Sequence, residues 1–219
     1  MGGITSLKFI DLNNWERKEH YNFFNKLDYP HFNICANVDI TNFYNFIKEN
    51  NLPFFLSFLF VVSKTANSID EFKLRIRENV IVQHEYIHPS FTIMTDKNLF
   101  GFCPVNFKEN FNEFLIESSK KMESSKSNLT LTDEPNRDDY LFITSIPWVS
   151  FTSISHPISM NPASSIPMVA WGKYFKENDK IKIPLSVEVH HALMDGSHIG
   201  IFFEKVQSIL DNPRKNIII

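Results

Sequence analysis

Two adjacent histidines, His190 and His191, precede the Asp195-Gly196 pair, and these residues are the best suited to chemistry in the chain. An imidazole has a pKa near neutrality and takes a proton from an alcohol, which accelerates a reaction by roughly 10² to 10⁴. A lone histidine is more often structural than catalytic. A doubled histidine followed by Asp-Gly favours a positioned base.

The segments on either side of this motif predict how the histidines are held. Residues 182–189 alternate apolar and polar side chains and are rich in branched residues, which is typical of a strand. After the motif, apolar residues recur at helical spacing: Ile199, Phe202, Phe203, Val206, Ile209 and Leu210. The motif is therefore expected at a strand-to-helix junction, which can hold a side chain stiffly and still expose it.

A metal site is the competing chemistry for the same motif, with His190, His191, Asp195 and His198 as ligands. Neighbouring histidines on an extended strand point to opposite faces, so both bind one ion only where the chain has already turned. We therefore expect no metal.

Composition predicts one domain and narrows its partners and compartment. The 219 residues are 43% hydrophobic, and no Pro, Gly or Ser-rich linker divides them, so residues 1–219 are expected to form a single domain. The net charge of -3 is spread over mixed-sign segments without a basic stripe, which argues against nucleic acid. Cys35 and Cys103 fit no metal or disulfide spacing, which favours a reducing compartment and thus the cytoplasm.

Neither of the most apolar stretches predicts export or a membrane anchor. Residues 1–12 turn polar too soon to supply a secretory apolar core. The run from Phe54 to Val62 is interrupted by Ser57 and is well short of the roughly 20 residues that a membrane span needs. We expect it to be a buried helix, and no membrane partner.

The order of the remaining segments predicts the fold class. Strand patterns alternate with helical patterns without a regular strand-helix beat, which indicates an α/β (α+β) two-layer sandwich rather than a Rossmann fold. We expect a mixed sheet with helices packed mainly on one face. The expected strands include 33–39, 80–83, 90–94, 99–103, 140–145, 148–153 and 167–172.

Motifs distributed along the chain resemble those of the chloramphenicol acetyltransferase family, within the CoA-dependent acyltransferases. The resemblance runs from about Lys8 to Leu210, and its specific motifs are residues 14–20, 89–92, 145–151, 172–174 and 184–196. The paired-histidine motif alone would be weaker, because it also resembles dihydrolipoyl acyltransferases and peptide-synthetase condensation domains. The family implies transfer of acetyl from acetyl-CoA to a hydroxyl of chloramphenicol, and hence antibiotic resistance.

The resemblance also implies catalytic roles. His191 corresponds to the general base and His190 to a supporting residue. Asp195 corresponds to an aspartate paired with an arginine, here Arg17, and we expect a bidentate contact that braces the loop. The oxyanion of the tetrahedral intermediate needs a hydroxyl donor, for which the alignment favours Thr144 and leaves Ser145 as the alternative.

Further family positions imply binding roles and an assembly. Acetyl-CoA is expected as co-substrate, with no tightly bound cofactor, along a tunnel that includes Trp148, Lys173 and Tyr174. The acceptor pocket is expected to draw on Phe23, Phe24, Phe32, Thr92, Phe100 and Phe102, aromatic walls suited to a nitrophenyl ring. The family implies a homotrimer with active sites between subunits.

Four departures from the family pattern keep other functions open. Ala170 replaces a threonine that helps hold a water, Phe24 replaces a tyrosine that helps bind the drug, Phe102 is bulkier than usual, and Pro53 stands near a lysine that contacts CoA phosphate. The alternatives are acyl transfer to a different small hydroxyl or amine acceptor, and a non-catalytic protein that binds an apolar ligand.

Overall fold

A seven-stranded mixed sheet forms the centre of the computed structural model, which describes residues 7–78, 80–127, 130–132, 134 and 137–219. β7 runs parallel to β5 and β8, and the other strand pairs are antiparallel. The strands, in spatial order, are β2 (His31–Asp39), β10 (Lys180–His190), β8 (Met168–Trp171), β7 (Tyr140–Ser145), β5 (His88–Met94) and β6 (Phe100–Pro104), and β9 (Phe175–Glu177) pairs with β10.

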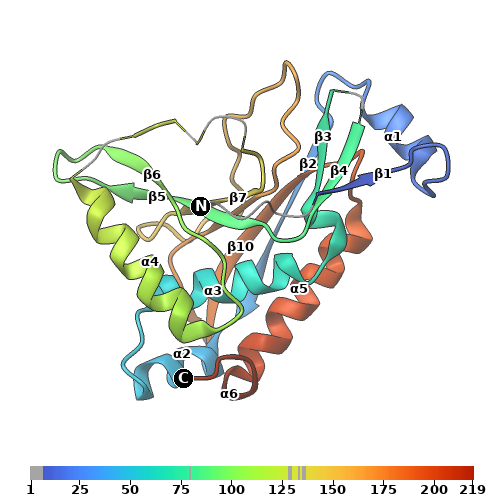
Figure 1. Ribbon diagram of the computed structural model, residues 1–219. Coiled ribbons are helices and arrows are strands. Elements are labelled where there is room, and N and C mark those ends of the chain that lie inside the picture. Colours follow the sequence, from blue (N-terminus) through green and yellow to red (C-terminus); the bar gives the residue numbers. More distant parts are fainter. Residues whose placement is uncertain (1–6, 79, 128–129, 133, 135–136) are drawn as a thin grey trace.

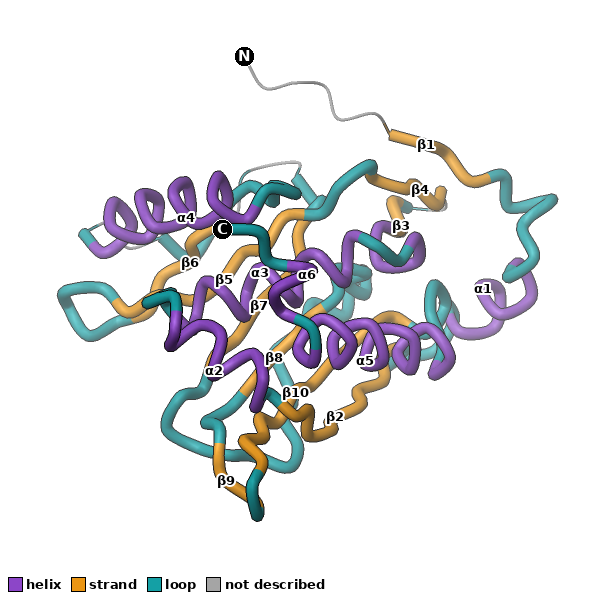
Figure 2. Tube along the Cα trace, turned by 90° about the horizontal axis from the view of Figure 1, so that it is seen from below, coloured by secondary structure: helices purple, strands orange, loops and turns teal. Residues whose placement is uncertain are grey.

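The helices gather on one face of this sheet, which confirms the predicted two-layer sandwich (Figure 1). The central helix, α3, is the buried helix expected from residues 54–62, and its apolar side chains fill the core. The helices are α1 (Lys18–Phe24), α2 (Thr41–Glu49), α3 (Phe54–Asn67), α4 (Phe111–Lys126), α5 (Gly196–Asp211) and the short α6 (Pro213–Asn216). Only α1 stands apart from this layer, beyond the end of α5 (Figure 2).

Both faces of β10 are buried, for different reasons. Successive strand residues point to opposite faces, so the fully buried Leu185 and Val187 pack into the core under the helices. Ser186, Glu188 and His190 point to the other face and are also buried. Residues 146–167, between β7 and β8, contact that second face through hydrogen bonds described below.

A smaller three-stranded sheet lies beside α1, with the order β1 (Leu7–Ile10), β4 (Val80–His84) and β3 (Leu74–Arg77). The sequence patterns do not predict β1 or β9. The strand predicted at 148–153 is wrong, because the chain is irregular there. Apolar side chains suggested that strand, but Trp148 and Val149 are exposed and pair with no ladder among the described residues.

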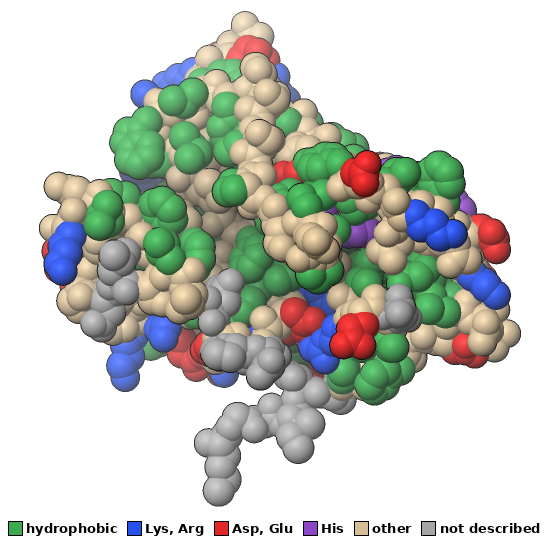
Figure 3. Space-filling model, turned by 90° about the horizontal axis from the view of Figure 1, so that it is seen from above, with side chains coloured by type: hydrophobic (Ala, Val, Ile, Leu, Met, Phe, Trp, Pro, Cys, Tyr) green, Lys and Arg blue, Asp and Glu red, His purple; other side chains and the backbone are tan. Residues whose placement is uncertain are grey.

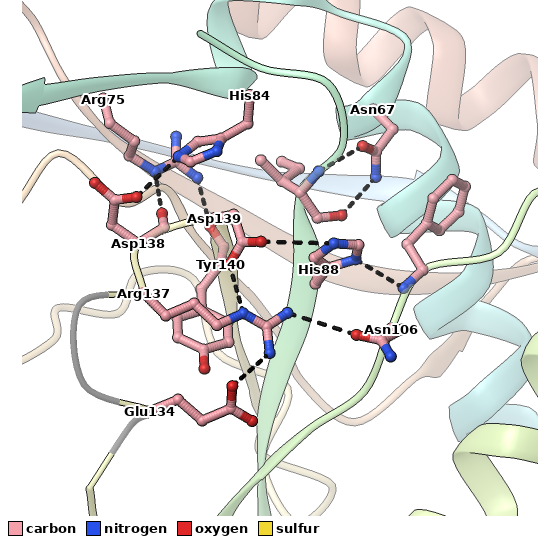
Figure 4. Close-up of polar contacts among 12 residues, drawn as sticks. Asn67, Arg75, His84, His88, Asn106, Glu134, Arg137, Asp138, Asp139 and Tyr140 are labelled. Atoms are coloured by element: carbon pink, nitrogen blue, oxygen red, sulfur yellow. Dashed lines mark hydrogen bonds and ion pairs between the residues drawn. The ribbon is translucent and has the colours of Figure 1, made fainter. Parts of the chain in front are cut away.

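A buried arginine ties the smaller sheet to the main one (Figure 4). Arg75 on β3 is fully buried and donates hydrogen bonds to the carbonyl oxygens of Phe72, Leu74, Asp138 and Tyr140. Burial lowers the pKa of Arg75 to about 10, which still leaves it charged at neutral pH. The guanidinium therefore satisfies carbonyl groups that would otherwise be buried without a partner.

Replacing Arg75 by methionine is expected to lower the free energy of unfolding by about 3 kcal/mol or more, because each abandoned carbonyl costs about 1 to 3 kcal/mol. Urea denaturation at fixed protein concentration measures the loss. Arg77→Met is the matched control: its side chain is 41% exposed and pairs with Asp138, so we expect a change within about 1 kcal/mol. Equal losses in the two variants would contradict the role of Arg75.

Candidate active site

His191 follows the last residue of β10 and lies in the turn that leads into α5. Its backbone N–H donates to the carbonyl oxygen of Pro30 at 2.7 Å, and its Nδ1 lies 3.0 Å from the carbonyl oxygen of Met194. A carbonyl only accepts, so Nδ1 carries the proton and Nε2 keeps its lone pair in the neutral ring. His191 thus has the tautomer of a general base.

Two phenylalanines hold the imidazole plane of His191. Phe24 at the end of α1 stacks on it, with ring centroids 3.8 Å apart and planes within 9°. Phe32 on β2 lies at 4.5 Å and 45°, and Phe23 packs edge-on against Phe24 at 5.1 Å. Phe23 itself is 63% exposed. The His191 ring is therefore oriented by aromatic contacts, and its surroundings are apolar and partly open to solvent.

His190 points away from His191, as alternation along a strand requires, and has a different environment. It is 1% exposed, its Nδ1 accepts from the N–H of Ala192 at 3.3 Å, and its ring packs edge-on against His31. Burial, followed by the nearby His31 and His191, lowers the pKa of His190 to about 4, so it is neutral at pH 7. This environment is that of a packing residue.

Among the described residues, no group of three or more His, Cys, Asp or Glu side chains is arranged to hold a metal ion.

Asp195 caps the N-terminus of α5 and pairs with Arg17, which precedes α1. The Asp195 carboxylate accepts from the backbone N–H and hydroxyl of Ser197, and Arg17 donates to it at 2.6 Å. Burial raises the pKa of Asp195, but the hydrogen bonds from Ser197 and Arg17 outweigh burial and hold it well below its usual range. The expected bidentate contact was wrong: one guanidinium nitrogen of Arg17 reaches Asp195, because the carboxylate is also engaged by the helix cap.

Replacing Asp195 by alanine is expected to lower the free energy of unfolding by about 2 kcal/mol, since the helix cap contributes about 1 kcal/mol and the ion pair about as much. Asp195→Asn keeps an oxygen for the cap and loses only the charge, so we expect about half that loss. Urea denaturation of both variants tests this difference. If the asparagine variant were as unstable as the alanine variant, the cap would not be the stabilising contact.

Thr144 and Ser145 lie far from His191 within one chain. The strand register aligns Thr144 with Ala170 and Ala170 with Ser186, which stands five residues before His191 on β10. His191 is therefore displaced from Thr144 by about 16 Å along the strand direction and by about 10 Å across the sheet, over two strand spacings. A hydroxyl at this distance cannot contact an oxyanion formed beside the same chain's His191.

Some of the candidate acceptor-binding residues lie around His191, and the others lie near Thr144. Phe23, Phe24 and Phe32 surround His191, whereas Thr92 pairs with Phe102 on the neighbouring strand β6. Because Phe91 aligns with Ile143, Thr92 lies beside Thr144. Phe100, half exposed, is at the start of β6, and its ring is 6.4 Å from that of Phe102.

We call the first set, with His191, the base group (Phe23, Phe24, Phe32, His191) and the second the hydroxyl group (Thr92, Phe100, Phe102, Thr144, Ser145). Thr144 is in register with Ala170, and Ala170 with Ser186, so Thr144 shares the sheet face of Ser186, which is the face away from the helices. Seen from above, the molecule is hollowed on this side between two raised parts, and apolar side chains line the hollow (Figure 3).

The CoA candidates lie around the residues that follow β7 and β8. The N–H of Lys173 donates to the carbonyl oxygen of Val149 at 2.8 Å, which brings Lys173 close to the 70% exposed Trp148. Gly172 permits this approach, because a Cβ there would lie 2.6 Å from the same Val149 oxygen. The backbone of Lys173 is therefore held beside the residue that follows Trp148, and both Trp148 and Lys173 are exposed.

Tyr174 extends the surface around Lys173, and it packs against Tyr44 and Phe54, which the sequence did not indicate as part of this site. The Tyr174 ring lies 5.4 Å from that of Tyr44 and 5.6 Å from that of Phe54. A hydrogen bond with Tyr44 and then burial raise the pKa of Tyr174, while Lys48 and Lys173 oppose the rise. Lys48 on α2 belongs to the same surface, since its ammonium lies 5.5 Å from the centroid of the Tyr44 ring, and its helical position gave no signal for this in the sequence.

No helix among the described residues is long and apolar enough to cross a membrane.

Comparison with known proteins gives relatives along almost the whole chain. Chloramphenicol acetyltransferases of Klebsiella sp, Proteus mirabilis and Bacillus pumilus are 28%, 27% and 28% identical to it. The alignments cover 95%, 94% and 91% of this chain and 95%, 95% and 91% of the respective relatives.

Solved structures show the same fold. A chloramphenicol acetyltransferase superposes with a TM-score of 0.83 at 24% identity, over 94% of this chain and 100% of that one. The dihydrolipoamide acetyltransferase of Azotobacter vinelandii superposes with a TM-score of 0.66 at 16% identity, over 90% and 87%. The family model described as chloramphenicol acetyltransferase matches residues 5–207. With that match over most of its length, the chain belongs to the chloramphenicol acetyltransferase family.

Proposed function

We propose that the protein transfers the acetyl group of acetyl-CoA to a hydroxyl of chloramphenicol, with His191 as general base. The observation that carries this proposal is the His191 imidazole, whose Nδ1 is bound to a carbonyl and whose plane is stacked on Phe24. Nε2 of His191 takes the proton of the acceptor hydroxyl as its oxygen attacks the thioester carbonyl. A base that is already oriented loses little entropy in reaching this geometry.

The rest of the reaction follows from the charge that develops. Attack gives a tetrahedral oxyanion directly, without an acyl-enzyme, and a hydroxyl donor stabilises it by roughly 10² to 10³ in rate. Thr144 is the donor that we favour, with Ser145 as the alternative. Collapse of the tetrahedral intermediate expels the CoA thiolate. The thiolate then receives from the His191 imidazolium the proton that came from the acceptor hydroxyl. Acetyl-CoA is consumed as a co-substrate and requires no tightly bound cofactor.

We further propose a homotrimer in which each site lies between two subunits. The long separation of the base group from the hydroxyl group within one chain supports this arrangement. The end position of β2 in the sheet supports it too, since its outer edge, with the exposed Asn33, Ile34 and Asn37, can receive another chain. In such a ring, His191 of one subunit meets Thr144 of the next.

For the co-substrate, we propose that the surface of Trp148, Lys173 and Tyr174 binds CoA. Lysine ammonium groups attract phosphates, and the exposed rings offer faces on which an adenine can stack. Lys48, whose ammonium lies over the Tyr44 ring that packs against Tyr174, is an additional phosphate contact in this proposal. Lys48 thus offers a cation in this chain, in which Pro53, at the start of α3, stands near the position of the family's phosphate-binding lysine.

The acceptor is tested by release of CoA thiol on mixing the protein with acetyl-CoA and chloramphenicol. We expect steady release that depends on both substrates, because neither the thioester nor the hydroxyl reacts alone at the site. A thiol reagent monitors the rate, and mass spectrometry identifies acetylated chloramphenicol. No release at millimolar concentrations of both substrates would overturn the proposed acceptor.

A different small hydroxyl or amine acceptor is the second candidate, and Ala170 favours it. Ala170 is fully buried between Thr144 and Ser186 in register, so this position has no hydroxyl to hold a water. A panel of alcohols and amines in the same thiol assay compares the acceptors. Chloramphenicol as the best substrate of the panel would reject this candidate.

A further inference from the structure

The segment Tyr29–His31 holds the backbone of the proposed base from outside its own turn. The carbonyl oxygen of Pro30, in the middle of this segment, accepts the N–H of His191 at 2.7 Å. The other close contact of His191, with the carbonyl of Met194, is made within the same turn and moves with it. Pro30 is therefore the contact from outside the turn that holds the backbone of His191, while Phe32 of β2 packs against its ring.

Side chains anchor this segment on both sides of Pro30. The hydroxyl of Tyr29 donates to Oε1 of Glu188 at 2.9 Å. His31 donates from Nε2 to the carbonyl oxygen of Ser164 at 2.6 Å. The ring of the half-exposed Tyr29 lies 5.5 Å from that of His31, and its hydroxyl makes one hydrogen bond, to the carboxylate, which fixes where the hydroxyl end of Tyr29 lies.

Glu188 is suited to be a fixed point. It is 2% exposed, lies on β10 three residues before His191, and its Oε2 accepts from Nδ1 of His156 at 3.0 Å. Burial raises the pKa of Glu188, but hydrogen bonds from His156 and Tyr29 outweigh burial and keep the pKa below its usual value. A buried carboxylate is costly unless it is paired, so both partners hold it in place.

We propose that Glu188 is a positioning residue for the base: through Tyr29 and the Pro30 carbonyl it sets the position of His191. A base must come within hydrogen-bond distance of the acceptor hydroxyl, and a displacement of about 1 Å can cost up to about 10² in rate. Glu188 touches neither substrate in this role. The inference rests on the proposed function, because it assigns to His191 the role of base.

Tyr29→Phe is the decisive variant, since the half-exposed ring stays and only the hydroxyl is lost. We expect kcat to fall about 10-fold with the KM for acetyl-CoA unchanged, because the displaced base slows the chemical step alone. We also expect the His191 amide, measured by hydrogen exchange in NMR, to exchange about 10-fold faster, as its bond to Pro30 opens more often. Glu188→Gln retains an oxygen that accepts from Tyr29, so its kcat should stay within about 3-fold of wild type.

Gln207→Ala is the matched control. Gln207 makes two hydrogen bonds of 2.9 Å to the backbone of Asp39, which pairs with Lys182 at the opposite end of β10 from His190. Its loss removes two contacts to β2 without touching the Tyr29–His31 segment, so we expect unchanged kcat and unchanged His191 exchange.

Support requires that Tyr29→Phe alters both kcat and the exchange of His191. A change in only one of them, or in neither, overturns the proposal, as does an equal fall of kcat in Gln207→Ala. A kcat loss in Glu188→Gln as large as in Tyr29→Phe overturns it as well. If the wild-type protein releases no thiol with chloramphenicol, the proposed function fails, while the exchange of His191 still shows whether Glu188 and Tyr29 hold its backbone.

Discussion

We expect His191→Ala to lower kcat for chloramphenicol acetylation by about 10⁴-fold, the upper end of what a positioned base contributes. In the proposed reaction Nε2 of His191 takes the hydroxyl proton, and the neighbouring His190 points to the other face of the sheet, where it cannot substitute. The thiol-release rate measures the loss. Circular dichroism checks that the fold is intact, because the variant leaves Phe24 without its stacking partner.

His190→Gln is the matched control for this experiment. His190 is neutral at pH 7, since burial lowers its pKa to about 4, so an uncharged amide replaces it without loss of charge. We expect a fall in kcat of less than about 10-fold, due to altered packing against His31. If the two variants lost equal activity, the assignment of His191 as the base would be wrong. If His191→Ala kept its activity, the protein would use another base.

The second large effect is expected in mixtures of two inactive variants. Thr144→Val removes the proposed oxyanion donor and should lower kcat by about 10² to 10³-fold. When Thr144→Val subunits are unfolded and refolded with an equal amount of His191→Ala subunits, we expect recovery of about a quarter of wild-type activity. Random assortment places an intact His191 beside a neighbour's intact Thr144 at that fraction of sites.

This recovery depends on the site lying between subunits. Separately refolded variants provide the control, and their mixed solutions without exchange of subunits should stay inactive. Activity that did not rise above the two separate variants would contradict a shared site, because a site within one chain is never repaired by a partner. A mass measurement in solution, which should give three copies, accompanies the assay. A Ser145→Ala variant shows whether the second hydroxyl contributes.

The strand-to-helix junction was readable from the sequence because its causes are local. Alternation over 182–189 and helical spacing from Ile199 come from side chains that lie near one another along the chain. The structure has β10 and α5 at these positions, and the mixed sheet with helices mainly on one face was predicted as well. The family was recognised from motifs spread along the chain, and the comparisons confirm it.

The predictions that failed concern pairing between distant segments. Residues 148–153 have the apolar side chains of a strand, but Lys173 engages Val149 by one backbone hydrogen bond and no ladder forms. The contact of Arg17 with Asp195 joins residues 178 positions apart, and its geometry depends on the cap of α5. A strand forms only where another strand pairs with it, and the geometry of an ion pair depends on how the two side chains approach each other. A local sequence pattern encodes neither.

By itself, the sequence predicted the candidate reactive groups, and it determined the strand and helix that carry them and the family to which the chain belongs. Only the tertiary structure decided where the backbone of His191 lies, since the carbonyl group of Pro30 accepts its N–H, whereas its tautomer follows from the Met194 carbonyl in the same turn. The structure also separated Thr144 from His191 and brought Tyr29 and His156 to Glu188. The physical reason is that residue type and spacing fix local conformation, whereas distances between segments arise from strand register and packing across the whole core.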